Sequence, residues 1–219
     1  MKRGYLQKYK DLFLHPKQFF KAVEKEKKYT PGLFFYVKIA AIVIIVNLIF
    51  TFINSFRNGQ LESSLVGIIL SNAIFSLGIA FAAPFISAAI VHLGVLVFGG
   101  RKGYFNTFKP SAYSISLQEG YSLLLLIIGE IFALFIFNAD LMNQLAAMQT
   151  LQDFPISMLV FLIISAIIYI VALINVLYVE TIGIAKFQKM SKGKAFLSII
   201  FVPVIVLLIL SALVYVGFI

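Results

Sequence analysis

Five long apolar stretches constrain the fold of this sequence more than any other feature. They cover residues 33–56, 65–98, 112–137, 156–185 and 195–219. Each is long enough to cross a bilayer, whose hydrocarbon core needs roughly 20 apolar residues per helix. Only 12% of the residues are charged and the mean hydropathy is +1.00, so the chain has too few polar side chains to cover the surface of a water-soluble protein. The sequence predicts an all-α integral membrane protein, an antiparallel bundle of five transmembrane helices.

The basic residues decide between one helix and two in the second stretch, where Pro84 stands mid-run. With five helices, the N-terminal segment and the loops at 99–109 and 186–194 share one side and hold every Lys and Arg except Lys38 and Arg57. The opposite loops hold Arg57 together with Glu62, Asp140 and Asp153. Short cytoplasmic loops are enriched in Lys and Arg. We therefore expect one helix kinked at Pro84, a cytoplasmic N-terminus and a C-terminus outside.

Glycine and proline mark the expected helix boundaries. Gly99 and Gly100 are expected to end the second transmembrane helix. Pro110 is expected to open the third helix and Pro155 the fourth, because a missing N–H costs nothing in the first turn.

Residues 1–32 form a basic amphipathic segment ahead of the transmembrane domain at 33–219. Apolar residues recur at helical spacing up to Pro16, and Phe19 and Phe20 then begin a second apolar face. Lys17, Lys21 and Lys25 follow one another at intervals of four on the other face. This pattern predicts a pair of interfacial helices, with both phenylalanines in the headgroup boundary and the three lysines toward anionic phosphates. The alternative is a helix pair that covers the cytoplasmic mouth of the bundle.

Several ionisable residues fall inside the apolar stretches, where each calls for a partner because charge is costly in a bilayer. Lys38, His92, Glu119 and Glu180 lie roughly 8 to 12 Å from the cytoplasmic helix ends, at 1.5 Å per residue. With Asn175 they form a predicted buried polar cluster. Its structural interpretation is a hydrogen-bonded clamp between helices, in which Lys38 pairs with Glu119 or Glu180 or snorkels alone. Its functional interpretation is a proton or cation site.

The sequence offers no pattern that indicates an enzyme, a cofactor or a metal. There is no cysteine, there are two histidines far apart in sequence, and the glycines at 99–103 lack P-loop spacing. The formal net charge of +9 lies beside hydrophobic spans, which favours anionic membrane lipid over nucleic acid as a partner. A protein partner or a homo-oligomer is also compatible with the sequence.

Short motifs along nearly the whole chain resemble the YIP-domain family, named for interaction with Ypt/Rab GTPases. They are Leu14-His15-Pro16-x-x-Phe19-Phe20, then His92 followed by Gly99-Gly100, then Tyr104-Phe105-x-Thr107-Phe108 leading to Ala112-Tyr113-Ser114, and Lys189-Met190-Ser191-x-Gly193-Lys194-Ala195. The resemblance implies five spans, a cytoplasmic N-terminus and, in eukaryotic members, a role in vesicle traffic. The chain is more similar to the shorter prokaryotic relatives, because Ser116-Leu117-Gln118 stands where many members have proline.

Two functions from different classes follow. The first is a non-catalytic membrane adaptor or membrane-shaping protein, favoured by the resemblance and the basic N-terminal segment. The second is a small ion- or proton-coupled channel or carrier that uses the buried polar cluster. The membrane would be the cell membrane in a prokaryote and that of the Golgi or endoplasmic reticulum in a eukaryote.

The charge distribution makes the topology testable with reporter fusions. A reporter after Arg101-Lys102 and one after Lys189 should lie on the same side as the N-terminus, and one near Gln144 should lie on the opposite side. Accessibility to a membrane-impermeant reagent would measure this. A reporter after Lys189 on the Gln144 side would refute the five-helix topology.

Overall fold

The computed structural model describes residues 4–57, 59, 63–135 and 155–215. The regular elements in this part of the chain are all helices, which confirms the predicted fold class. They are α1 (Tyr5–Leu14), α2 (Pro16–Ala22), α3 (Thr30–Arg57), α4 (Ser63–Val97), α5 (Phe105–Phe135), α7 (Ile156–Gln188) and α8 (Lys192–Tyr215).

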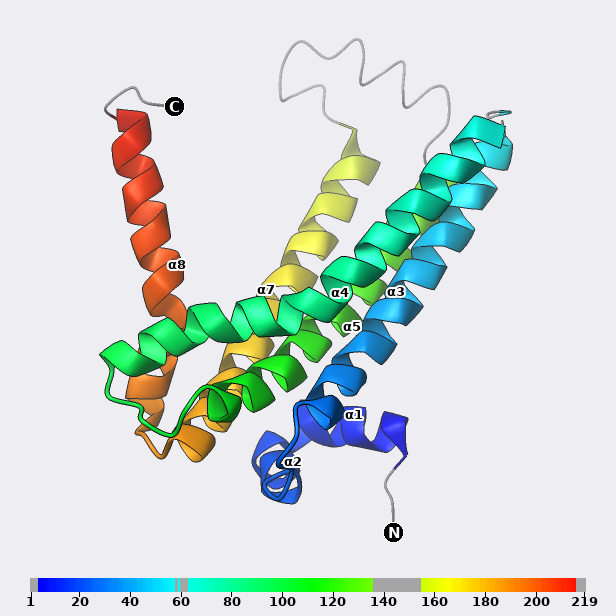
Figure 1. Cartoon of the computed structure of the whole chain (residues 1–219). Coiled ribbons are helices and arrows are strands. Elements are labelled where there is room, and N and C mark those ends of the chain that lie inside the picture. The colour runs from blue at the N-terminus through cyan, green and yellow to red at the C-terminus, as the bar shows by residue number, and fades with distance from the viewer. Residues whose placement is uncertain (1–3, 58, 60–62, 136–154, 216–219) are drawn as a thin grey trace.

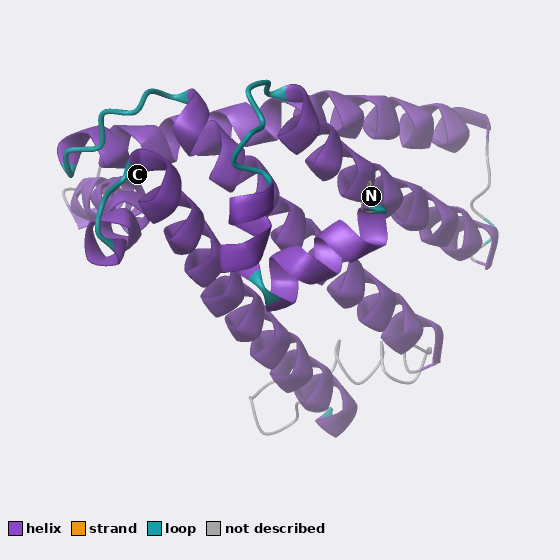
Figure 2. Ribbon diagram, turned by 90° about the horizontal axis from the view of Figure 1, so that it is seen from below, coloured by secondary structure: helices purple, strands orange, loops and turns teal. Residues whose placement is uncertain are grey.

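The five long helices are apolar enough to cross a membrane. Helix α5 is central, because it packs against α3, α4 and α7, while α8 packs against α4 and α7. Figure 1 shows the short helices α1 and α2 at one end of these long helices, the end that also carries the α4–α5 loop and the α7–α8 turn. We call it the α1/α2 end. Viewed from that end in Figure 2, the N-terminal helices lie across the ends of the long helices.

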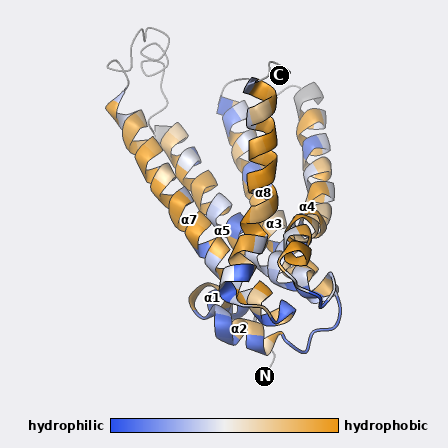
Figure 3. Cartoon of the chain, turned by 90° about the vertical axis from the view of Figure 1, so that its left-hand side faces the viewer, coloured by the Kyte–Doolittle hydropathy of each residue, from blue (hydrophilic) through white to orange (hydrophobic). Residues whose placement is uncertain are grey.

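Hydropathy follows the same division. The long helices are mostly hydrophobic in Figure 3, and hydrophilic residues gather on α1, α2 and the loops beside them. A bundle arranged this way keeps its charged groups in water at the α1/α2 end while the helices lie in lipid. The acidic residues Glu62, Asp140 and Asp153, expected in the opposite loops, lie outside the described residues.

The long helices extend beyond the apolar stretches at the α1/α2 end. Helix α5 begins at Phe105 rather than near residue 112, and α8 begins at Lys192 rather than at 195. Pro110 therefore lies inside α5 and does not open it. A Cβ added to Gly183 of α7 would lie 2.4 Å from the Pro110 Cβ, so the ring packs closely against the neighbouring helix. Hydropathy marks only the part of a helix that lies in lipid, and for this reason the sequence placed these boundaries too late. Pro155 directly precedes α7 as its N-cap.

Helix α4 is continuous through Pro84 and bends part-way along its length (Figure 1). An internal proline removes one hydrogen bond and clashes with the preceding turn, which produces such bends. The helix ends at Val97, just ahead of the predicted glycines: Gly99 has a φ of +89°, which suits glycine, and the Gly100 N–H donates to the Val95 carbonyl at 2.8 Å.

Helix α8 contacts the bundle only through its first part. A Cβ added to Gly94 of α4 would lie 2.0 Å from the Ser198 carbonyl oxygen, so the two backbones approach closely there. Further along, every residue of α8 from 203 to 215 is exposed, and Figure 1 shows this part standing away from the other helices. The contact at Gly94 therefore has a large share in fixing the position of α8.

Substitution of Gly94 tests this contact. Gly94→Ala should lower the stability in detergent by about 1–3 kcal/mol, because the added methyl group meets the α8 backbone. The matched control is Gly78→Ala in the same helix, where a Cβ meets nothing within 4 Å. The control should be neutral or slightly stabilising, since alanine is the better helix former. Thermal unfolding of both variants would measure the difference, and equal melting temperatures would contradict the close approach.

Candidate functional site

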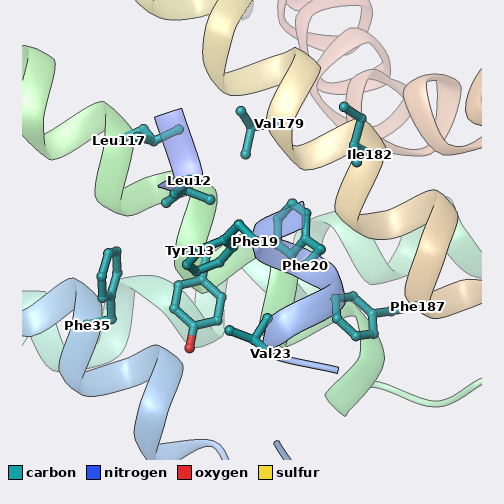
Figure 4. Packing of buried hydrophobic residues seen from close by; sticks show 10 residues of the cluster. All are labelled: Leu12, Phe19, Phe20, Val23, Phe35, Tyr113, Leu117, Val179, Ile182 and Phe187. Carbon is teal, nitrogen blue, oxygen red and sulfur yellow. The ribbon is translucent and has the colours of Figure 1, made fainter. Parts of the chain in front are cut away.

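The N-terminal helices are part of the hydrophobic core rather than an appendage at the lipid surface. Figure 4 shows Phe19 and Phe20 of α2 pointing into a cluster with Tyr113 of α5 and with Val179 and Ile182 of α7. Phe19 is 2% exposed and Phe20 is fully buried. The prediction that these two side chains contact lipid headgroups is therefore wrong, because the ends of α5 and α7 offer them an apolar surface first. The alternative, a helix pair that covers the end of the bundle, describes the structure.

The lysines of this segment lie on the opposite face. Lys17, Lys21 and Lys25 are exposed, while Phe19 and Phe20 are buried. In a helix, residues four apart share a face, and Lys17 and Lys21 therefore point away from the side that packs on the bundle. The structure presents three cationic groups on a segment whose other side is packed.

Lys109 of α5 holds the end of α2 in place. Its side chain is 3% exposed, and its Nζ donates to the backbone carbonyls of Val23, Glu24 and Glu26 at 3.3, 3.3 and 2.6 Å. The same ammonium group lies 4.6 Å from the centre of the Phe187 ring. These carbonyls belong to the turn that follows α2, and those of Glu24 and Glu26 accept no other hydrogen bond among the described residues. Lys109 supplies the hydrogen-bond donors that this turn needs.

Two acidic side chains fasten the chain that follows α2. The Tyr113 hydroxyl donates to Oε2 of Glu26 at 2.8 Å. Oε2 of Glu24 lies 3.0 Å from Nζ of Lys186, at the end of α7. The hydrogen bond and the charge of Lys186 lower the pKa of Glu24. The ion pair is therefore present at neutral pH and is lost as the pH falls through the lowered pKa.

Helix α1 is attached through its tyrosines. The Tyr5 hydroxyl donates to the Phe35 carbonyl of α3 at 3.0 Å. Burial raises the pKa of Tyr5 to about 12, so this hydroxyl stays protonated and remains a donor. The Tyr9 hydroxyl reaches the Ser116 carbonyl of α5 at 3.4 Å and sits directly over Gly120. A side chain at position 120 would occupy the space that Tyr9 needs.

The predicted cluster of Lys38, His92, Glu119, Asn175 and Glu180 does not form. Lys38 is exposed, on the side of α3 opposite the buried Tyr36 and Ala40, and within the described residues it pairs with no carboxylate. Its Nζ lies 5.7 Å from the centre of the Tyr5 ring. Equal depth in the membrane was the basis of the prediction. It was insufficient because the side chains leave their helices in different directions.

Of the other members of that set, Glu119, His92 and Glu180 have separate partners. Glu119 accepts a hydrogen bond from the Tyr36 hydroxyl at 3.2 Å, and the buried Glu180 accepts one from Oγ of Ser111 at 2.6 Å. Nδ1 of His92 lies 2.8 Å from Oγ1 of Thr107. Oδ1 of Asn175 is buried and, within the described residues, has no hydrogen-bond partner. Each carboxylate is thus held by a neutral donor from a neighbouring helix.

Sequence reasoning missed a polar stripe on α5. Thr107, Ser111 and Ser114 recur at helical spacing and are all buried. Gln188 of α7 donates to Oγ1 of Thr107 at 2.9 Å and to the Gly103 carbonyl at 3.0 Å. A run of hydroxyl residues at intervals of three and four in an apolar helix is the signal that could have revealed this stripe. The burial of Lys109 could not be predicted in this way, because a lysine directly ahead of a transmembrane stretch is usually an exposed loop residue.

A cleft of about 450 Å³ lies beside Glu180, between α4, α7 and α8. Apart from Glu180 and Ser87 its walls are apolar, with Ile79, Ile90 and Ile199 among them. The carboxylate at the wall already accepts the Ser111 hydrogen bond. The cleft thus combines a lipid-like lining with one acceptor that is held in place.

The Yip1 domain profile matches residues 10–213 of the chain. The chain belongs to the Yip1 domain family. The resemblance read from the short motifs is therefore confirmed. The matched region of this Yip1-domain protein begins within α1 and includes Phe19 and Phe20, so the whole of α2 falls within it. Neither the search of curated proteins nor that of solved structures gave a match.

Replacement of Lys109 should loosen the N-terminal segment. Lys109→Met removes the donor to three carbonyls and should cost about 2–4 kcal/mol, because buried acceptors lose a charged partner. Limited trypsin digestion should cut faster between residues 25 and 28, and the melting temperature in detergent should fall. Lys102→Met is the matched control, an exposed lysine just ahead of α5, and should stay within about 0.5 kcal/mol of the unaltered protein. Equal digestion rates for the two variants would contradict the role of Lys109.

Proposed function

We propose that this Yip1-domain protein is a non-catalytic membrane adaptor whose α1/α2 end recognises a protein partner. The observation that carries the proposal is the two-sided packing of α2, in which buried phenylalanines hold one face and Lys17 and Lys21 are exposed on the other. A surface fixed in advance loses little conformational freedom on binding. Exposed cations favour a partner with an acidic surface and speed its association.

The orientation is part of the same proposal. The basic residues gathered at the α1/α2 end support a cytoplasmic location of that end, with the C-terminus across the membrane. In a prokaryote this membrane is the cell membrane, and in a eukaryote it is that of the Golgi or endoplasmic reticulum, where the adaptor would serve vesicle traffic or membrane shaping.

The arrangement of the intramembrane carboxylates supports the adaptor over the channel or carrier. Ionisable groups on an ion pathway through the membrane face the bundle interior or a water-filled cavity and commonly pair with one another. Here Glu119 pairs with Tyr36, Glu130 accepts from Nδ2 of Asn54 at 2.9 Å, and Glu180 pairs with Ser111. Such interhelical hydrogen bonds hold membrane helices together.

Affinity purification of charge variants tests the adaptor function. The tagged full chain, extracted from its native membrane in mild detergent, should capture a protein whose binding weakens as salt rises. Substitution of Lys17, Lys21 and Lys25 by Gln should reduce capture about tenfold, at roughly 0.5 kcal/mol per exposed charge. The matched control replaces Lys189, Lys192 and Lys194, three exposed lysines at the α7–α8 turn, and should retain the partner. Recovery of lipid alone, or equal capture by both triple variants, would contradict the proposal.

A further inference from the structure

Lys38 is a cation in a membrane-spanning helix with no acidic partner among the described residues. It lies about two turns inside α3, and its side chain points away from the bundle, toward α1. Its ammonium group lies over the Tyr5 ring, 5.7 Å from the ring centre. A charge at this depth is costly unless an anion or water lies beside it. No carboxylate among the described residues supplies that counter-charge to Lys38.

A small pocket joins Lys38 to helix α1. It has a volume of about 180 Å³ and is lined by Tyr5, Lys8, Pro31, Phe34, Phe35 and Lys38. The lysines come from separate helices, and the fold brings both to this pocket. The Tyr5 hydroxyl already donates to the Phe35 carbonyl, which leaves the two ammonium groups as the charged donors of the pocket. Two cations that line one pocket, with no carboxylate among its lining residues, favour an anion with several acceptor oxygens, such as a phosphate diester.

The outer face of α3 continues the pocket as an apolar track. Ile42, Ile45, Ile49 and Ile53 are all exposed, and they follow Phe34 and Lys38 at intervals of three and four residues. Residues with this spacing form one stripe along a helix. The stripe begins at the pocket and runs along the membrane-spanning length of α3, where it faces lipid tails.

We propose that the pocket between α1 and α3 is a binding site for an anionic phospholipid, with its phosphate between Lys8 and Lys38 and an acyl chain along the stripe from Ile42 to Ile53. A lipid fits better than free phosphate because the cations and the apolar track adjoin, and one amphiphilic molecule matches both. The site uses different residues from the basic face of α2. It does not depend on the adaptor function.

A lipid bound in this pocket would also hold α1 against α3. Tyr5 and Lys8 lie on α1, while Phe34 and Lys38 lie on α3, so a phosphate in the pocket contacts both helices. A ligand that binds only the assembled pocket stabilises the folded arrangement by mass action. The anionic lipid should therefore raise the melting temperature of the full chain.

Native mass spectrometry and thermal unfolding of the full chain in detergent would test the site. The probes are dioleoylphosphatidylglycerol, the matched zwitterionic lipid dioleoylphosphatidylcholine, and inorganic phosphate. We expect one tightly held phosphatidylglycerol and a rise in melting temperature, with neither effect from phosphatidylcholine. Lys38→Met and Lys8→Gln should each weaken binding about fivefold, as expected for one charge near a membrane surface. Lys38→Arg should retain binding.

The controls separate this site from general attraction to basic residues. Like Lys8, Lys10 belongs to α1, but it is exposed and does not line the pocket. Lys10→Gln should therefore leave lipid binding unchanged. Lys38 is exposed and its replacement should leave the protein folded, which size-exclusion chromatography would verify. Equal binding of both lipids, or equal losses in the Lys10 and Lys38 variants, would overturn the site. Stabilisation by inorganic phosphate as large as that by phosphatidylglycerol would overturn its assignment to a lipid.

Discussion

The burial of one ammonium group, that of Lys109, governs the organisation of the α1/α2 end. A charge out of water is costly unless several acceptors surround it. Here three backbone carbonyls of the turn after α2 are those acceptors, and two of them, those of Glu24 and Glu26, have no other hydrogen-bond donor among the described residues. The two costs cancel only when α2 lies across the end of α5. The interaction thus requires the N-terminal segment to pack on the bundle.

Hydrophobic burial and this charge act in the same direction. Phe19 and Phe20 cover the ends of α5 and α7, and Lys109 fixes the turn that follows the same short helix. A helix of seven residues is unstable in isolation, because nucleation costs more than so few hydrogen bonds return. Packing therefore supplies the stability, and the exposed lysines become a surface with a defined position. A disordered basic segment would offer the same charge with a larger entropy cost on binding.

The sequence was sufficient for the features that depend on one helix at a time. Apolar length predicted five spans, Pro84 the bend in α4, and Gly99 the end of that helix. It failed where the direction of a side chain around the helix decided the outcome. Depth along the axis placed Lys38 at the level of Glu119 and Glu180, but depth does not say toward which neighbouring helix a side chain points. The aromatic face of α2 fitted lipid and bundle equally well, since both are apolar, and only the tertiary arrangement separates them.

The membrane explains why the intramembrane carboxylates pair with neutral donors rather than with lysine. A buried ion pair must overcome the desolvation of two charges, whereas a carboxyl group beside a hydroxyl or amide donor requires at most one. Glu119, Glu130 and Glu180 follow the second solution, with Tyr36, Asn54 and Ser111 as donors. Lys38 is left to reach toward α1 and the bilayer surface, where its long aliphatic stem lets the charge leave the hydrocarbon. Because the carboxylates pair with neutral donors, Lys38 lines the pocket beside α1 together with Lys8. An anionic headgroup would supply the counter-charge that these two lysines lack within the described protein.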